Sequence, residues 1–194
     1  MNQPASPIRH PPSRRLRRRA AGFTLIEAAL TTIIVGTGVL AIVAAQQAYH
    51  MQNDWAQRTG TGMLLANEIR ELTLTMPMYD PIAGKDGLGT KGDNVAAFNC
   101  VADFAGSASP SAFKGSTTFT PPIDARRETF SDLERWRQTV TVRNVWADEL
   151  DAADGNPPTL ADTDVMRVTV DVHYREPHAD EFKLVTTLSW IVTE

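Results

Sequence analysis

Apolar residues change their spacing along the first half of the chain. From Phe23 to Ala45, 23 consecutive residues carry one charge, that of Glu27. A membrane-spanning helix needs about 20 mostly apolar residues, so this stretch predicts a membrane span over 23–45. Beyond it, apolar side chains recur every three or four positions, which predicts an amphipathic continuation of the helix over 46–76, ended by Pro77. The apolar positions are Ala48, Met51, Trp55, Met63, Ala66, Ile69 and Leu72.

The amphipathic stripe from Ala48 to Leu72 is expected to pack the helix onto the carboxy-terminal part of the chain. Gly60 and Gly62 predict a bend or a loosened turn, because each glycine costs about 1 kcal/mol relative to alanine in a helix. Inside the apolar segment, small residues would let neighbouring helices approach closely, although such residues are frequent in any membrane helix. These small residues are Ala28, Ala29, Gly36 and Gly38.

The remainder of the chain predicts a small antiparallel sheet. Residues 77–130 are rich in glycine, proline, serine and threonine and predict an irregular connecting region, with short apolar pieces at Val95 to Phe98 and at Phe104 tucked against the sheet. Within 131–194, three segments alternate apolar and polar residues as half-buried strands do: 136–142, 166–174 and 182–190. Pro177 lies in the turn between the last two. The expected fold class is α+β, with the amphipathic helix covering one face of a sheet of three or four strands.

Charge divides the chain unevenly. The formal net charge is −4, yet residues 1–22 hold six arginines and no acidic residue. Subtracting these six charges leaves −10 for the rest, which argues against a body that binds nucleic acid, since phosphate contacts need clustered basic side chains. Because the arginines directly precede the apolar segment, the positive-inside rule places the amino terminus in the cytoplasm and the sheet domain on the far side of the membrane.

Little in the sequence suggests catalysis or a bound metal. Cys100 is the only cysteine, and the four histidines form no metal-ligand spacing: His10, His50, His173 and His178. His173 and His178 are expected to be solvated. The acidic stretches 86–93 and 147–164 lack the spacing of a calcium loop, so a solvated loop or a subunit-contact surface is expected there and calcium is the alternative. No enzyme activity, cofactor or metal is expected.

Two ordinary export signals could also account for the amino-terminal segment. A secretory signal peptide could be removed after Ala45, although its apolar region usually has about 7 to 15 residues. The run Ser13 to Arg17 could serve as a twin-arginine address. Neither reading explains why an acidic residue lies near the start of the apolar segment.

The stretch from Gly22 to Glu27, GFTLIE, follows a basic leader and opens an apolar helix. It closely resembles the processing site of type IV prepilins and type II secretion pseudopilins. The resemblance implies cleavage after Gly22 by a prepilin peptidase, methylation of Phe23 as the new terminus, and retention of the helix. It also implies that Glu27 pairs with the terminal amine of a neighbouring subunit.

Glu27 also fits a local role. Thr24 and Glu27 have the spacing of a capping box, in which both side chains satisfy amide groups in the first helical turn. An ionised carboxylate inside lipid is unfavourable, however, by roughly 2.5 to 3.5 kcal/mol at the bilayer centre and by less near its surface. The amine of a processed Phe23 would be positively charged at neutral pH and would offset this cost. The capping and pairing roles are compatible.

A second, looser resemblance lies in GTGVLAIVAAQQA, residues 36–48, and LLANEIREL, residues 64–72. It points to the minor subunits, either type IV pilus modification pilins or I-type minor pseudopilins. The family implies a pilin-like fold, no enzyme activity, and three kinds of partner: the prepilin peptidase, other pilin or pseudopilin subunits, and the inner-membrane assembly platform. The chain lacks the carboxy-terminal cysteine pair found in many pilins. Pilus, secretion pseudopilus and DNA-uptake systems are not distinguished, and a secreted soluble binding or hydrolytic domain cut after Ala45 is the alternative.

Overall fold

The computed structural model describes residues 23–92, 94–150 and 158–193. One α-helix, α1, runs from Leu25 to Leu74, close to the predicted end. The chain divides into two units, Met1–Tyr49 and His50–Glu194, so the boundary falls inside α1. The leader peptide, including Gly22, lies outside the described residues.

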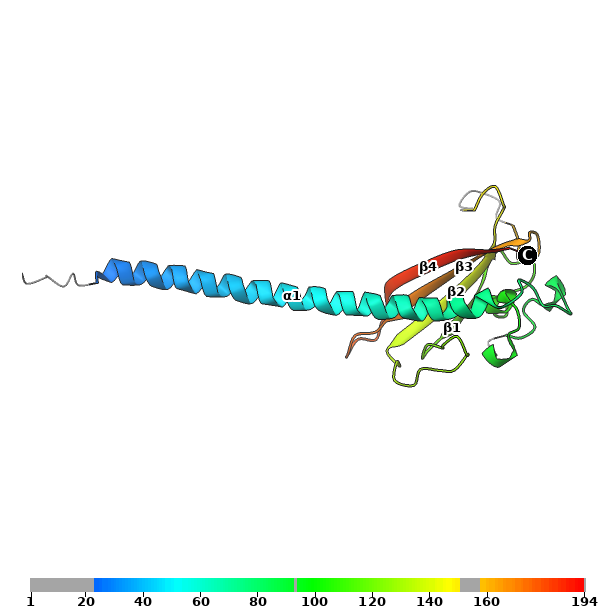
Figure 1. The fold of residues 1–194 in the computed structure, drawn as a ribbon, viewed down its shortest axis with the longest axis horizontal. Coiled ribbons are helices and arrows are strands. Elements are labelled where there is room, and N and C mark those ends of the chain that lie inside the picture. The colour runs from blue at the N-terminus through cyan, green and yellow to red at the C-terminus, as the bar shows by residue number, and fades with distance from the viewer. Residues whose placement is uncertain (1–22, 93, 151–157, 194) are drawn as a thin grey trace, which may run out of the picture. The chain divides into compact units, whose positions relative to one another are not determined.

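The second unit contains one four-stranded antiparallel sheet in the order β1-β2-β3-β4 (Figure 1). Its strands are β1 (Gly115–Phe119), β2 (Trp136–Asn144), β3 (Val165–Tyr174) and β4 (Lys183–Thr193). The α+β layout, the three predicted strands and the turn between the last two are confirmed. On β3 the even-numbered residues from Met166 to Val172 are buried and the odd-numbered ones are half-buried, as the alternation predicts.

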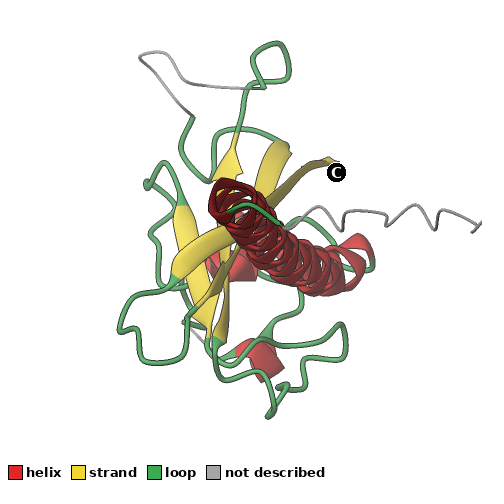
Figure 2. Cartoon of the chain, turned by 90° about the vertical axis from the view of Figure 1, so that its left-hand side faces the viewer, coloured by secondary structure: helices red, strands yellow, loops and turns green. Residues whose placement is uncertain are grey.

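The carboxy-terminal part of α1 packs against one face of this sheet, and Figure 2 views the fold from the amino-terminal end of the helix. Its buried residues begin at Gly62 and recur down one side of the helix: Leu65, Ala66, Ile69 and Leu72. They join a core that includes the inward-facing valines of β2 and β3. Burying these apolar surfaces stabilises the unit by about 25 cal/mol per Å² removed from water.

The part of the amphipathic stripe that packs on the sheet begins later in the helix than predicted. Met51 is 74% exposed, Trp55 66% and Met63 42%, and Ala48 is exposed as well. The correct part of the stripe is Ala66, Ile69 and Leu72. Spacing of three and four residues identifies one side of a helix, but how much of that side is covered depends on how far the sheet reaches along it.

The predicted loosened turn is not formed, because α1 is helical through both Gly60 and Gly62. The two glycines differ in their surroundings. A Cβ at Gly60 would meet nothing within 4 Å, whereas a Cβ at Gly62 would lie 3.0 Å from Thr186 Cγ2 and 3.3 Å from Val185 Cγ1. The absence of a side chain at Gly62 therefore allows α1 to approach β4 closely.

The connecting region 77–130 has more structure than predicted. It contains three short 3₁₀ helices, Lys85–Gly87, Val95–Ala97 and Val101–Ala105, as well as the edge strand β1. Phe98 and Phe104 are buried with their rings in edge contact, 5.1 Å between centroids, which confirms that these apolar pieces pack into the core. The sheet thus begins before residue 131, with β1 paired along β2 from Gly115 to Phe119.

A buried glutamine joins the layers. Gln138 on β2 is fully buried, and its amide donates to the Leu65 carbonyl of α1 at 2.8 Å and to the Ile123 carbonyl at 3.2 Å. Its side-chain oxygen accepts a hydrogen bond from the Ile123 amide at 2.8 Å. Because a buried polar group without partners is costly, these bonds specify how helix, strand and loop meet.

Candidate functional site

The start of α1 is capped by Thr24. The Thr24 hydroxyl accepts a hydrogen bond from the Glu27 amide at 3.3 Å, and the Thr24 carbonyl accepts from the amides of Glu27 and Ala28 at 3.0 and 3.1 Å. Replacing such a cap by alanine typically costs about 0.5 to 2 kcal/mol of helix stability. The threonine half of the predicted capping box is therefore present.

Glu27 lies in the first turn of α1, where the helix dipole favours an acidic side chain. It is exposed, as is Phe23, which precedes the helix and is 69% exposed. The two residues are separated by about one helical turn. This arrangement leaves the carboxylate available to a cation of another molecule.

The helix that follows is apolar on all sides. Its large side chains are exposed around the whole circumference, for example Leu25 at 90%, Ile34 at 68% and Leu40 at 70%. By its length and composition, the helix is long and apolar enough to cross a membrane. A helix that is apolar all round needs lipid or other helices to cover it. Gly36 and Gly38 leave open space on this surface, since a Cβ at either would meet no atom within 4 Å.

A second surface, absent from the sequence-based predictions, lies where α1 passes the end of the β3–β4 hairpin. Both terminal nitrogens of the Arg58 guanidinium donate to the Glu176 carboxylate, and the bond from Nη2 to Oε2 measures 3.2 Å. The same guanidinium lies over the Tyr174 ring, 4.7 Å from its centroid. A shallow pocket beside this pair is lined by Trp55 and Leu184, which are 66% and 58% exposed. The sequence signal that could have located it is Trp55, a bulky aromatic residue beyond the apolar segment.

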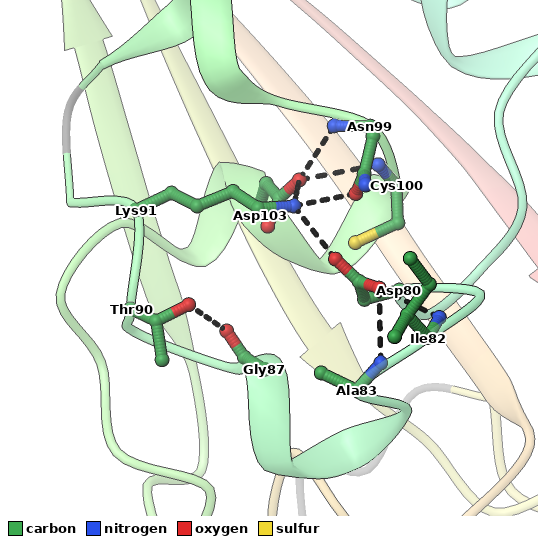
Figure 3. Close-up of polar contacts among 9 residues, drawn as sticks. All are labelled: Asp80, Ile82, Ala83, Gly87, Thr90, Lys91, Asn99, Cys100 and Asp103. Carbon is green, nitrogen blue, oxygen red and sulfur yellow. Dashed lines mark hydrogen bonds and ion pairs between the residues drawn. The ribbon is translucent and has the colours of Figure 1, made fainter.

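The connecting region is held by one polar cluster (Figure 3). The Lys91 ammonium donates to Asp80 at 3.0 Å, to Asp103 at 2.9 Å and to the Asn99 side-chain oxygen at 2.5 Å. Asp103 also accepts from the backbone amides of Asn99 and Cys100, while Asp80 accepts from those of Ile82 and Ala83. Lys91 thus joins Asp80, Asn99 and Asp103, so the cluster acts as a structural clamp on the connecting region.

The charges of this cluster stabilise one another. Backbone hydrogen bonds from Ala83 and Ile82, followed by the bond from Lys91, hold the pKa of Asp80 well below its usual value. Partial burial disfavours the charged form of Lys91, but its bonds to Asp103 and Asp80 outweigh that effect and raise the Lys91 pKa. Burial raises the pKa of the Cys100 thiol to about 12, so this thiol is not a nucleophile at neutral pH.

The acidic stretches are partly engaged in local contacts. Asp162 accepts a hydrogen bond from the Thr159 amide, which lowers the pKa of Asp162, and Asp164 pairs with Lys85 at 3.0 Å. Residues 93 and 151–157 lie outside the described ranges. Within those ranges, no group of three or more histidine, cysteine, aspartate or glutamate side chains could hold a metal ion. His173 is half-buried on β3 rather than fully solvated, and His178 lies in the turn after it.

Comparison with known proteins adds no relative: no family model matches the chain, and neither curated proteins nor solved structures gave a match. The structural features on which a functional assignment rests are therefore a long amino-terminal helix that is apolar enough to span a membrane and a small antiparallel sheet that covers its carboxy-terminal part.

Proposed function

We propose that the chain is a non-enzymatic, prepilin-like minor subunit of a type IV pilus or type II secretion pseudopilus. It is inserted in the cytoplasmic membrane with its amino terminus in the cytoplasm, trimmed after Gly22, and drawn into a filament through its apolar helix. The single observation that carries the proposal is the start of that helix. An acidic residue, Glu27, lies in the first turn of a capped helix, and the apolar side chains that follow it are exposed within the described residues.

The physical reason is that the carboxylate gains only part of its stabilisation from its own chain. The helix dipole and the cap favour an acid in the first turn. Within lipid, a charged partner would lower the cost of the carboxylate further. The freed amine of Phe23 on a neighbouring subunit has the right charge, and the partners of the proposal follow: a prepilin peptidase, other pilin-like subunits and a membrane assembly platform.

The decisive experiment is the mass of the mature amino terminus in protein purified from native membranes. Cleavage after Gly22 gives a chain beginning at Phe23, heavier by one methyl group if the amine is methylated. A chain beginning at Gln46 would contradict the proposal. Processing should tolerate Gly22→Ala far better than Gly22→Trp, because the peptidase must approach this backbone closely.

Three variants distinguish pairing of Glu27 with a neighbouring subunit from its role in capping the helix. Glu27→Ala should spare processing and impair incorporation into filaments. Glu27→Gln, which keeps the shape and hydrogen-bonding capacity but loses the charge, should be equally impaired, and Thr24→Ala, which removes only the cap hydroxyl, should be incorporated. If both Glu27 variants were incorporated normally, the pairing role would be contradicted and Glu27 would act only in capping the helix.

A second candidate function is a secreted soluble binding or hydrolytic domain cut after Ala45. The observation that favours it is that the unit from His50 onward contains its own core, with its helical part buried only from Gly62. Such a domain would not need residues 23–45 to fold. The same mass measurement separates the two functions, since only this one yields Gln46 as the terminus.

A further inference from the structure

In the part of the chain that the structure describes, no further strand pairs with either edge of the sheet. Among the described residues, β1 pairs only with β2 and β4 only with β3. Natural edge strands are usually guarded by charged residues, prolines or bulges, because unpaired backbone groups bind other strands. β1 has no charged residue and no proline, and β4 has only Lys183, at its first position.

The protection of β4 is confined to its beginning. The register of β4 against β3 shifts between Val172 and His173, leaving Val185 as an extra residue, and such a bulge twists an edge away from incoming strands. From Thr187 to Thr193 the strand has no bulge, charge or proline. The open edge of β4 is therefore its last seven residues.

The topology decides which strand can be added. Each strand is antiparallel to the next from β1 to β4, so the two edge strands, β1 and β4, run in opposite directions. When a second copy lies beside the first in the same orientation, its β1 therefore runs antiparallel to β4. Pairing of β4 with β4 about a two-fold axis would instead point the carboxy-terminal parts of the two α1 helices in opposite directions.

The exposed face of the sheet indicates a register. Two rows of mostly hydroxyl-bearing residues cross all four strands in order. One row starts at Ser116 and ends at Ser189, and the other starts at Thr118 and ends at Thr187. Neighbours within the rows are bonded, as between Thr169 and Ser189 at 3.0 Å and between Thr187 and Asp171 at 2.6 Å. In antiparallel pairing, a single register places Ser189 opposite Ser116 and Thr187 opposite Thr118, which continues both rows into the next copy.

We propose that copies of this chain associate head to tail by adding β1 of one copy to the open edge of β4 of the next. Ser116 then lies opposite Ser189, and residues Gly115 to Thr118 lie opposite Trp190 to Thr187. Such a heterologous contact is not closed by two subunits and extends along a ring or filament. With only five residues in β1, the contact is weak for free molecules. The inference rests on the proposed function in one respect: anchoring in a common membrane raises the effective concentration of the edges.

The test is disulfide cross-linking of the full-length chain in its native membranes. Directly opposite residues on antiparallel strands have Cα atoms about 4.5 to 5.5 Å apart, within disulfide range. Within one chain, positions 116 and 189 are three strand spacings apart, about 14 Å, so they cannot form an internal disulfide. The native Cys100 is buried, so it is not expected to form cross-links between chains.

Ser116→Cys with Ser189→Cys should give an oxidant-dependent ladder of dimers and larger species, and so should Thr118→Cys with Thr187→Cys. The matched control is Ser116→Cys with Thr193→Cys, which moves the thiol about 13 Å along the edge and should remain monomeric. Each single-cysteine variant should also remain monomeric. Thermal unfolding of every variant is compared with that of the parent chain to exclude misfolding.

Three outcomes would overturn the inference: absence of cross-links in both in-register pairs, dimers from Ser189→Cys alone, or cross-links only to a different protein. The proposed function is tested by a separate measurement, the mass of the mature amino terminus, so its failure can be told apart from failure of the strand pairing. A chain that begins at Phe23 but yields no ladder refutes the strand pairing alone. A ladder from a chain that begins at Gln46 refutes the membrane assembly alone.

Discussion

Two isoleucines on α1 show how differently its two ends are used. Ile33 is 62% exposed in the apolar half, whereas Ile69 is fully buried in the half that meets the sheet. Both lie in the same helix with the same backbone geometry. The difference lies in the surroundings of each side chain. Around Ile33 the neighbours on the helix are exposed and mostly apolar, whereas around Ile69 polar residues face outward and the sheet covers the apolar side.

The comparison indicates that the two halves are stabilised by different environments. The half from His50 is held by the chain's own core, and its stability should respond to changes in packing. The side chains of the apolar half are exposed within the described residues, so this half should respond to changes that alter its transfer into lipid. Variants that act on one half and spare the other sharpen this division, and variants that act on both would break it.

The largest effect is expected from a charge in the apolar half. Ile34→Arg should abolish stable membrane retention, because an arginine near the centre of a spanning helix costs about 2.5 to 3.5 kcal/mol. The matched control is Leu64→Arg, at a position 69% exposed on the same helix beyond the apolar half. Alkaline carbonate extraction of membranes measures retention. Equal extraction of both variants would show that residues 23–45 are not the anchor.

A core truncation should give the next largest effect. Ile69→Ala is expected to lower the free energy of unfolding of the second unit by about 2 to 5 kcal/mol, because it leaves a cavity between helix and sheet. Leu64→Ala, which removes an exposed side chain of similar size, should change it by less than about 0.5 kcal/mol. Denaturant unfolding followed by circular dichroism measures both. Similar losses for the two would contradict the burial assigned to this face.

The two glycines should respond in opposite directions. Gly62→Val is expected to destabilise the second unit by about 1 to 3 kcal/mol, since its side chain would be forced against Thr186 and Val185. Gly60→Ala meets open space and should stabilise the helix by up to about 1 kcal/mol. Thermal unfolding of the pair tests whether only Gly62 marks a close approach.

The smallest effect is expected in acid. Because hydrogen bonds lower the pKa of Asp80 in the folded chain, its contribution is present above the usual aspartate pKa of about 3.9 and is lost as the pH falls toward the lowered value. Asp80→Asn should therefore flatten the decline of unfolding free energy below about pH 4 and leave the second unit less stable at pH 7. An unchanged acid profile in this variant would assign the decline to other carboxylates.

Sequence patterns located the elements with long regular periods. The membrane-length segment, the helix end at Pro77 and the three alternating strands follow directly from the spacing of apolar residues. β1 was missed because Gly115–Phe119 has five residues, only one of them a large apolar residue, within a stretch rich in glycine and proline. Its strand character comes from pairing with β2, which local sequence does not encode.

Of the candidate site, the sequence supplied the capping threonine and the acidic residue in the first turn, both of which the structure places at the helix start. It did not supply the clamp around Lys91. Asp80, Asn99 and Asp103 come from separate parts of an irregular region, and no spacing rule brings them together. The buried Gln138 was hidden for a related reason, since its partners, Leu65 and Ile123, are distant in sequence.

By itself, the sequence determined the long helix, three of the strands, and that one helical segment is long and apolar enough to span a membrane. Those properties depend on the order of side chains along a single element. Only the tertiary structure decided where the buried part of the helix begins, that Gly62 is a contact and Gly60 is not, and that β1 and β4 lie at the edges of the sheet. Each of these depends on which distant residues share the same space, and apolar periodicity contains no information about that.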